Sequence, residues 1–385
     1  MKTIAEINER IKQGKAVVLT AEEMTKAVKE MGAEKAAKEI DVVTTGTFSP
    51  MCSSGMLFNI GQTEAPSLRA SKMWLNDVPC CAGLAAVDGF LGATEVREGD
   101  PLNQIYPGEF KYGGAHVIED LIAGRKVKLC CESYTTDCYP KKFFEKEITI
   151  NDLKYAQMLN PRNCYQNYNV AVNENQNRIL YTYMGALRPH MQNANYATAG
   201  ELSPLFNDPY FKTIGLGTRI FLGGGVGYVI GAGTQHVPNP KRTEKGIPMS
   251  GSGTLMVKGD MKQMSDRYIR AHSLLGYGVS MAVGVGIPIP ILNAEMAQFT
   301  GVSNEDILMP VKDYSRDYQN LNPRIIKHVS YAELVSGTIE IEGRKVETHP
   351  LTSYQRSREI AEVLKEWIEK GEFLLTQSVE TIEAY

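Results

Sequence analysis

The chain has 385 residues, a net charge of −3 and 43% hydrophobic residues, so it can bury a large core in two or three lobes. The absence of a basic run argues against a nucleic-acid partner, and no apolar stretch is long enough to span a bilayer. Residues 1–15 alternate in charge and lack the apolar core of a secretory signal, so we expect a cytoplasmic protein.

The first fifty residues predict a strand–helix–strand unit. Thr20 and Glu23 form a capping-box pattern that begins a helix at 21–31, and the β-branched run 42–45 follows as a buried strand. The two strands of such a unit pair in parallel, and ligands collect beyond their carboxyl ends, where we expect Cys52. Further predictions here are a helix at 4–13, a strand at 16–19 and a helical piece at 33–40.

Cys52 lies in a loop among small residues, Ser53, Ser54 and Gly55, which leave a thiol sterically open. If a helix begins at Ser53 or Ser54, its dipole favours a thiolate at Cys52. A buried, inert cysteine in a turn is an equally good interpretation of this stretch alone.

The chain contains seven cysteines, at positions 52, 80, 81, 130, 131, 138 and 164. Their count is odd, two pairs are adjacent, and we expect a reducing compartment, so no disulfide framework is predicted. No C-x-x-C motif is present, which disfavours zinc-ribbon and thioredoxin-like sites. Thiol chemistry and metal ligation both remain open.

Two cysteine pairs fall in regular elements. Residues 74–92 predict a turn around Pro79 and then a helix or strand of small residues in which Cys80 and Cys81 pack. Residues 126–132 alternate as a strand, so Cys130 and Cys131 face opposite sides.

Between these pairs, His116 lies in the first turn of a helix predicted at 115–123. The helix dipole lowers a histidine pKa there, and a capping or core role is favoured over a catalytic one.

The next loop, SYTTDCYP, repeats the arrangement seen at the first cysteine: a strand, a hydroxyl-rich loop, Cys138 and a turn. A helix capped by Asn151 is then predicted at 152–159, and the loop after it carries Arg162 and Cys164. The three cysteines at 52, 138 and 164 therefore lie in polar loops, which is the best local sign that they are chemically used.

From residue 178 the chain is rich in strands. The glycine-rich residues 213–235 do not fit the dinucleotide fingerprint, and a hairpin is favoured over an anion-binding nest near Arg219. His236 ends this stretch in a loop. Further predictions are a helix at 265–275, a strand and then an extended segment at 279–292, a linker or lid at 310–325, a hairpin turning at Glu342 and Gly343, and a helix at 353–370.

These elements indicate an α/β fold, with a mixed α+β arrangement still open. We divide the chain into residues 1–175, an α/β part with the cysteine loops, and residues 176–385, a strand-rich part with the C-terminal hairpin and helix. One intertwined domain is the alternative.

The sequence lacks a Walker loop, a G-x-S-x-G motif and an H-E-x-x-H motif. A thiol-centred reaction remains, in which loop cysteines carry a persulfide, bond to an aldehyde carbon or resolve one another as disulfides. The alternative is that Cys52, Cys138 and Cys164 ligate three irons of a four-iron four-sulfur cluster, which leaves the fourth iron for sulfide.

Seven blocks, spread over nearly the whole chain to about residue 370, resemble the anaerobic homocysteine-biosynthesis family in the same order. They are GTFSPMCSSG, YGGAHVIEDL, SYTTDCYP, NPRNCYQNYN, GELSPLFNDP, GTRIFLGGGVGYVIGAGTQH and GTLMVKGD.

The resemblance implies a sulfurtransferase that inserts sulfur reductively into the aldehyde of L-aspartate semialdehyde to give L-homocysteine through essential cysteines. Cys52 matches the first family cysteine, Cys138 is our choice for the second, with Cys131 as its competitor, and Cys164 is the third candidate. The resemblance also implies a sulfide or persulfide donor and a separate ferredoxin-like protein as reductant. Another small aldehyde, such as sulfoacetaldehyde, and a sulfur or iron–sulfur carrier without aldehyde turnover are the alternatives.

In the mechanism that we expect from this reaction, Cys52 holds the sulfur, and Cys138 then forms a disulfide with it as the oxidised state. Such a disulfide requires the two Cα atoms to lie within roughly 7 Å. A guanidinium binds the substrate carboxylate, and a histidine moves the proton released with water. The candidates are Arg162, Arg219, His116 and His236. A homodimer is the default for an enzyme of this size.

Overall fold

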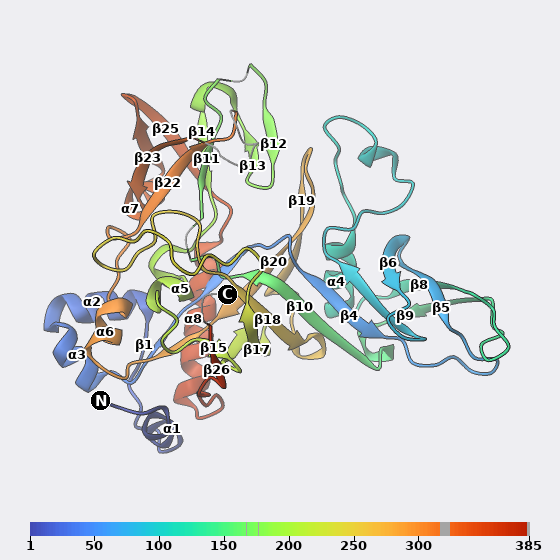
Figure 1. Ribbon diagram of the computed structural model, residues 1–385, viewed down its shortest axis with the longest axis horizontal. Coiled ribbons are helices and arrows are strands. Elements are labelled where there is room, and N and C mark those ends of the chain that lie inside the picture. Colours follow the sequence, from blue (N-terminus) through green and yellow to red (C-terminus); the bar gives the residue numbers. More distant parts are fainter. Residues whose placement is uncertain (167, 176, 316–323, 383–385) are drawn as a thin grey trace.

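The computed structural model describes residues 1–166, 168–175, 177–315 and 324–382. It is a mixed α/β protein rich in strands, built around one large antiparallel sheet and one smaller mixed sheet (Figure 1). The predicted α/β class is therefore confirmed in its mixed form. In the described part of the chain no helix is long and apolar enough to cross a membrane.

The large sheet contains thirteen strands, all paired antiparallel. In spatial order they are β19 (Ile269–Leu274), β20 (Gly278–Gly286), β16 (Arg219–Leu222), β17 (Gly225–Ala232), β18 (Leu255–Asp260), β10 (Tyr155–Asn163), β4 (Gly55–Asn59), β7 (Asp88–Gly92), β6 (Val78–Ala82), β5 (Ala70–Leu75), β8 (Val127–Ser133) and β9 (Phe143–Ile148), with β3 (Thr47–Pro50) paired to β20. Strands from both sides of residue 175 thus share one sheet.

The smaller sheet mixes parallel and antiparallel pairs. Its order is β23 (Ile325–Ser330), β22 (Leu308–Asp313), β11 (Val170–Val172), β14 (Asn193–Tyr196), β25 (Arg344–Pro350) and β24 (Thr338–Ile341). Short two-stranded ribbons join β12 (Leu180–Thr182) to β13 (Gly185–Leu187), and β15 (Gly215–Leu216) to β26 (Glu380–Thr381).

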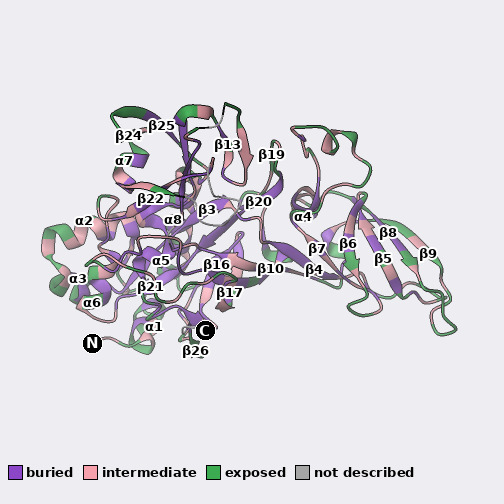
Figure 2. Ribbon diagram, turned by 45° about the horizontal axis from the view of Figure 1, so that its top comes forward, coloured by how far each residue is buried: buried purple, intermediate pink, exposed green. Residues whose placement is uncertain are grey.

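The helices are short except for one. They are α1 (Ile4–Lys12), α2 (Ala21–Met31), α3 (Ala33–Glu39), α4 (Gly114–Ile122), α5 (Pro204–Asn207), α6 (Ala294–Thr300), α7 (Tyr331–Val335) and the sixteen-residue α8 (Tyr354–Glu369). Figure 2 shows that buried residues gather where these helices meet the two sheets, whereas β5, β6, β8 and β9 extend from this body as an arm.

The predicted N-terminal unit is confirmed. Thr20 and Glu23 form the capping box of α2, and the strands on either side, β1 (Val18–Thr20) and β2 (Val42–Thr44), pair in parallel. A third strand, β21 (Pro288–Pro290), pairs antiparallel with β2. At Gly46 a Cβ atom would lie 2.1 Å from the backbone carbonyl oxygen of Ser357 in α8, so glycine is needed for the chain to pass this helix into β3.

Other local predictions are also confirmed. The helix at 353–370 is α8, which buries Ile360, Leu364 and Ile368 on one face. The hairpin β24–β25 turns at Glu342 and Gly343, both with positive φ, as a type I′ turn requires. The glycine-rich stretch forms the hairpin β16–β17.

Several predicted helices and turns are wrong. Residues 155–163 form strand β10 with alternating burial, and residues 269–274 form strand β19, where we predicted helices at 152–159 and 265–275. Sheet pairing overrides the weak helical signal in both. Strand β10 lies between β18 and β4, which come from distant parts of the chain, and β19 pairs with β20, the strand that follows it in a hairpin. Pro79 lies inside β6 rather than in a turn.

The linker or lid predicted at 310–325 is also wrong at its start, because residues 308–313 are strand β22. Residues 316–323 lie outside the described part of the chain.

Candidate active site

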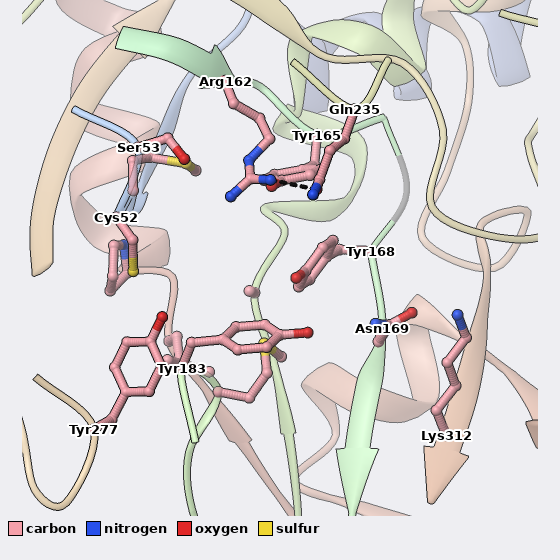
Figure 3. A pocket seen from close by; sticks show the side chains of 15 residues that line it. Cys52, Ser53, Arg162, Tyr165, Tyr168, Asn169, Tyr183, Gln235, Tyr277 and Lys312 are labelled. Carbon is pink, nitrogen blue, oxygen red and sulfur yellow. Dashed lines mark hydrogen bonds between the residues drawn. The ribbon is translucent and has the colours of Figure 1, made fainter. Parts of the chain in front are cut away.

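A cavity of about 330 Å³ opens where the large sheet meets the smaller one (Figure 3). Its wall comes from the β3–β4 turn, the end of β10, the β10–β11 loop, the β12–β13 turn, the β19–β20 turn and β22. The lining residues are Pro50, Met51, Cys52, Ser53, Arg162, Tyr165, Tyr168, Asn169, Tyr183, Met184, Ala197, Gln235, Tyr277, Lys312 and Leu351. These described lining residues include two cations and one thiol and no carboxylate, so they suit an anionic group of a ligand.

Cys52 supplies the thiol. It lies in the turn between β3 and β4, so the helix considered after Ser53 is not formed and no helix dipole acts on the sulfur. Instead, Cys52 Sγ lies 3.1 Å from the hydroxyl oxygen of Ser280, a fully buried residue of β20. A hydroxyl in this position can donate a hydrogen bond to a thiolate. The partly exposed Cys52 is therefore reachable from the cavity and has a polar partner.

Arg162 extends into the same cavity from the end of β10. Its guanidinium donates a hydrogen bond to Gln235 Oε1 and lies over the ring of Tyr165, 5.8 Å from the ring centroid. Its buried Nε has no acceptor among the described residues. The predicted substrate-binding role of Arg162 is thus compatible with its position.

The opposite side of the cavity contains Lys312, Asn169 and a cluster of tyrosines (Figure 3). Burial lowers the pKa of Lys312 and raises the pKa of Tyr168. The hydroxyl groups of Tyr183 and Tyr314 are hydrogen-bonded at 2.8 Å.

The arm carries five of the other cysteines, away from this cavity. Cys138 is exposed in the β8–β9 loop, where its carbonyl accepts a hydrogen bond from Ser67 Oγ at 3.1 Å. Strand β4 lies between Cys52, which precedes its first residue, and Ser67, which follows its last. The length of this strand alone, roughly 16 Å, separates Cys52 from Ser67 and hence from Cys138. In this arrangement one chain does not bring Cys52 and Cys138 within disulfide reach.

Cys131 is no closer to the cavity. It is fully buried on the inner face of β8, and burial raises the pKa of its thiol to about 12. Cys130 faces the other side of β8, as predicted, and Cys80 is buried in β6. Cys81 was expected to pack, but it is exposed.

Cys164 lies two residues after Arg162 but points into the core. It is 4% exposed, and burial raises the pKa of its thiol well above the ordinary value. Within residues 1–166, 168–175, 177–315 and 324–382, no three His, Cys, Asp or Glu side chains come together as a metal-binding group. A cluster held by Cys52, Cys138 and Cys164 of one chain therefore does not fit these positions, because one thiol is in the core and another is on the arm.

The remaining predicted residues lie outside the cavity lining. Arg219 stacks on Phe373, 4.5 Å from the ring centroid. His116 accepts a hydrogen bond at Nδ1 from the Gly113 N–H and caps α4, as favoured, and burial lowers its pKa. His236 hydrogen-bonds through Nδ1 to the backbone of Thr254.

Two further residues at the cavity, Ser280 and Lys312, were not predicted from the sequence. Ser280 is hidden in the apolar run of β20, and Lys312 follows the apolar residues at the start of β22. A lone cation within a buried strand was the one available signal for Lys312, because a charged side chain is rarely placed there without a role.

A family model described as "homocysteine biosynthesis enzyme, sulfur-incorporation" matches residues 16–375. The chain belongs to this family. Two relatives of this homocysteine-biosynthesis enzyme are named L-aspartate semialdehyde sulfurtransferase. One, from Methanosarcina acetivorans, is 48% identical over 99% of this chain and 72% of its own length. The other, from Methanocaldococcus jannaschii, is 49% identical over 99% of this chain and 73% of its own length.

A more distant relative from Methanothermobacter thermautotrophicus, 28% identical over 87% of this chain and 72% of its own length, is an uncharacterized protein. No solved structure matches the chain significantly.

Proposed function

We infer that this chain is an L-aspartate semialdehyde sulfurtransferase of homocysteine biosynthesis. The observation that carries this inference is the identity of 48% and 49%, over 99% of the chain, to two relatives that bear this name. The family description, homocysteine biosynthesis with sulfur incorporation, supports it independently.

The cavity beside Cys52 fits this reaction in its chemistry. L-Aspartate semialdehyde carries a carboxylate, an ammonium and an aldehyde, and the lining offers cations, amide groups and one thiol. Among the described residues no carboxylate lines the cavity, which lowers the cost of bringing the substrate carboxylate and a hydrosulfide ion into it together. We therefore place the reaction at Cys52.

In the proposed chemistry, sulfur attacks the aldehyde carbon and the carbonyl oxygen leaves as water, which gives a thioaldehyde. Two electrons and two protons then reduce the carbon–sulfur double bond to the thiol of homocysteine. When the sulfur comes from a Cys52 persulfide, two more electrons and two more protons return Cys52 to the thiol as the sulfur–sulfur bond breaks. Whenever Cys52 is deprotonated, the Ser280 hydroxyl can donate a hydrogen bond to its sulfur.

The electrons need a donor, and we propose a separate ferredoxin-like protein in that role. Since Cys138 lies on the arm, we do not assign it as an internal electron relay within one chain. His116 and His236 lie outside the cavity lining, so we do not assign them the proton that leaves with water.

The test is an anaerobic assay with L-aspartate semialdehyde, sulfide and reduced ferredoxin, in which L-homocysteine is measured. The wild-type protein should form homocysteine, Cys52→Ser should not, and Cys81→Ser, which changes an exposed cysteine of the arm, should behave as the wild type. A wild-type protein that binds sulfane sulfur but forms no homocysteine would instead be a sulfur carrier.

A further inference from the structure

The proposed reaction at Cys52 needs a proton donor beside the aldehyde oxygen. When sulfur adds to the aldehyde carbon, the oxygen gains an electron pair, and it must take up protons before it can leave as water. The described residues that line the cavity include no histidine, aspartate or glutamate. Among these residues, the proton donors that remain are hydroxyl groups and cationic side chains.

Tyr277 is held near Cys52 by the turn that precedes β20. Strand β20 begins at Gly278 and runs antiparallel to β3, and Ser280 of this strand contacts the Cys52 sulfur. Tyr277 is the last residue before the strand, and its backbone N–H donates a hydrogen bond to the Leu274 carbonyl at 3.0 Å, which closes the β19–β20 turn. The pairing that brings Ser280 to the sulfur therefore also brings Tyr277 to this end of the cavity.

The side chain of Tyr277 is aimed at the thiol. Figure 3 shows its hydroxyl directed toward the Cys52 sulfur. The ring of Tyr183 packs against that of Tyr277, with 6.1 Å between the centroids and 61° between the planes. The hydroxyl of Tyr183 points away from Cys52 and is bonded to that of Tyr314. Tyr277 is also 41% exposed, so its phenol can exchange protons with water.

The other donors of the cavity lining are less suited to this step. The hydroxyl of Ser53 is a much weaker acid than a phenol, and the guanidinium of Arg162 does not give up its proton in a protein. Tyr165 lies beside Arg162, whose guanidinium is 5.8 Å from the Tyr165 ring centroid. Figure 3 places Tyr168 and Lys312 farther from the thiol, toward the opposite end of the cavity.

We propose that Tyr277 is the general acid of sulfur addition, a catalytic residue beside the Cys52 thiol. This role rests on the proposed function. A sulfur lone pair forms the carbon–sulfur bond, the π electron pair of the carbonyl moves to the oxygen, and the oxygen takes the phenolic proton of Tyr277. The step leaves a hydroxyl on the carbon and a tyrosinate. It is the same for hydrosulfide and for the outer sulfur of a Cys52 persulfide.

When hydrosulfide is the nucleophile, Tyr277 also serves the loss of water. The tyrosinate takes the proton of the newly bound S–H group and returns it to the hydroxyl as the carbon–oxygen bond breaks. The carbon–sulfur double bond forms and water leaves. A proton from solvent then restores the phenol, which the exposure of Tyr277 permits. These steps consume no electrons, because reduction begins only with the thioaldehyde.

The test measures kcat/KM for L-aspartate semialdehyde in the anaerobic homocysteine assay. Tyr277→Phe keeps the ring and removes the proton donor, so it should lower kcat/KM about a hundredfold or more. Tyr228→Phe is the matched control, at a tyrosine of β17 that is also 41% exposed and lies outside the described cavity lining. It should stay within about twofold of the wild type. Thermal melts check that both variants are folded.

Two further readouts separate an acid from a residue that only packs. After anaerobic treatment with polysulfide, Tyr277→Phe should carry as much added sulfur on the Cys52 peptide as the wild type, because the thiol is unchanged. Replacement of Tyr277 by 3,5-difluorotyrosine keeps the phenol but makes it ionise at lower pH. The alkaline fall of kcat/KM should then move to lower pH, because a general acid must be protonated to act.

Three results would overturn this role for Tyr277. They are a folded Tyr277→Phe protein with the kcat/KM of Tyr228→Phe, a loss of added sulfur from its Cys52 peptide, and an unchanged pH profile in the difluorotyrosine protein. None of them would affect the proposed function, which fails separately if the wild type forms no homocysteine from the aldehyde.

Discussion

The turn that carries Cys52 and the loop that carries Cys138 look alike in sequence and differ in the folded protein. Each cysteine follows a strand and a hydroxyl-rich segment. Cys52 lies in a cavity and contacts the hydroxyl of Ser280, whereas Cys138 is exposed on the arm and contacts Ser67 only through its own backbone carbonyl. A local pattern therefore identifies loop cysteines, but residues far away in the sequence decide which of them has a binding site.

The largest expected difference between the two cysteines is catalytic. Cys52→Ser should lower homocysteine formation by roughly a thousandfold or more, because a serine hydroxyl neither carries sulfur nor ionises near neutral pH. Cys138→Ser should keep the rate within about threefold when a dithiol reductant supplies the electrons, because Cys138 is not among the described residues that line the cavity. The measurement is the rate of homocysteine formation for both variants in one assay.

If Cys138→Ser is as inactive as Cys52→Ser, the proposed difference between the two cysteines is wrong. The arm must then bring Cys138 to the cavity of the same chain or to that of a second copy of the chain.

Two arginines sharpen the same comparison, because Arg162 lines the cavity and Arg219 does not. Arg162→Ala should lower kcat/KM about tenfold to a hundredfold, because it removes a cation from the cavity wall. Arg219→Ala should leave kcat/KM within about twofold and lower the free energy of unfolding by only about 0.5–1 kcal/mol through its lost contact with Phe373. Steady-state kinetics and denaturant unfolding of both variants test this pair, and equal kinetic losses would refute the assignment.

Cys164 provides a structural counterpart to Cys52. Cys164→Ser should lower the free energy of unfolding by about 1–3 kcal/mol, because it places a hydroxyl in a fully buried position without a designed partner. Cys164→Ala is the matched variant and should retain activity per folded molecule, as should Cys164→Ser. Urea unfolding gives the stability, and a folded but inactive Cys164→Ala protein would place this thiol in the reaction.

The smallest expected effect concerns His116. Burial lowers its pKa below the ordinary value of 6.5, so between these two pKa values the unfolded chain binds more protons than the folded one. The free energy of unfolding should therefore fall as the pH drops from 7 through this range. His116→Gln still caps α4 but does not titrate, so its melting temperature should depend less on pH.

Thermal melts between pH 7.5 and pH 5 measure this dependence. His349→Gln, at a half-exposed histidine on the surface, serves as the control and should keep the wild-type slope. An unchanged slope in His116→Gln would show that another group, such as the half-buried His272, dominates the pH dependence.

The elements with strong local signals were predictable. The capping box at Thr20 and the positive-φ turn at Gly343 each define an element within a few residues, and both are confirmed. Strand β10 was not predicted, because its partners come from distant segments and its alternating burial is only visible once the sheet is known. Strand β19 pairs with the next strand along the chain, but it lies at the edge of the sheet and its burial does not alternate, so its sequence lacks the strand pattern.

The residues of the site also divide into those that a local sequence pattern predicts and those that only the fold brings to the cavity. Cys52 and Arg162 were predicted from their own loops, and both line the cavity. Ser280 reaches Cys52 because β20 pairs with β3, and Lys312 reaches the cavity because β22 pairs in parallel with β11. These pairings join segments more than a hundred residues apart, so no local pattern could have indicated them.

The most direct test of sulfur chemistry at Cys52 is mass spectrometry of the intact protein after anaerobic treatment with polysulfide, a donor of sulfane sulfur, with peptide mapping before and after L-aspartate semialdehyde and reductant are added. We expect one added sulfur atom on the Cys52 peptide, which disappears as homocysteine forms. Added sulfur found only on the Cys131 or Cys138 peptides, and consumed by the aldehyde from there, would contradict the assignment of the reaction to the Cys52 cavity.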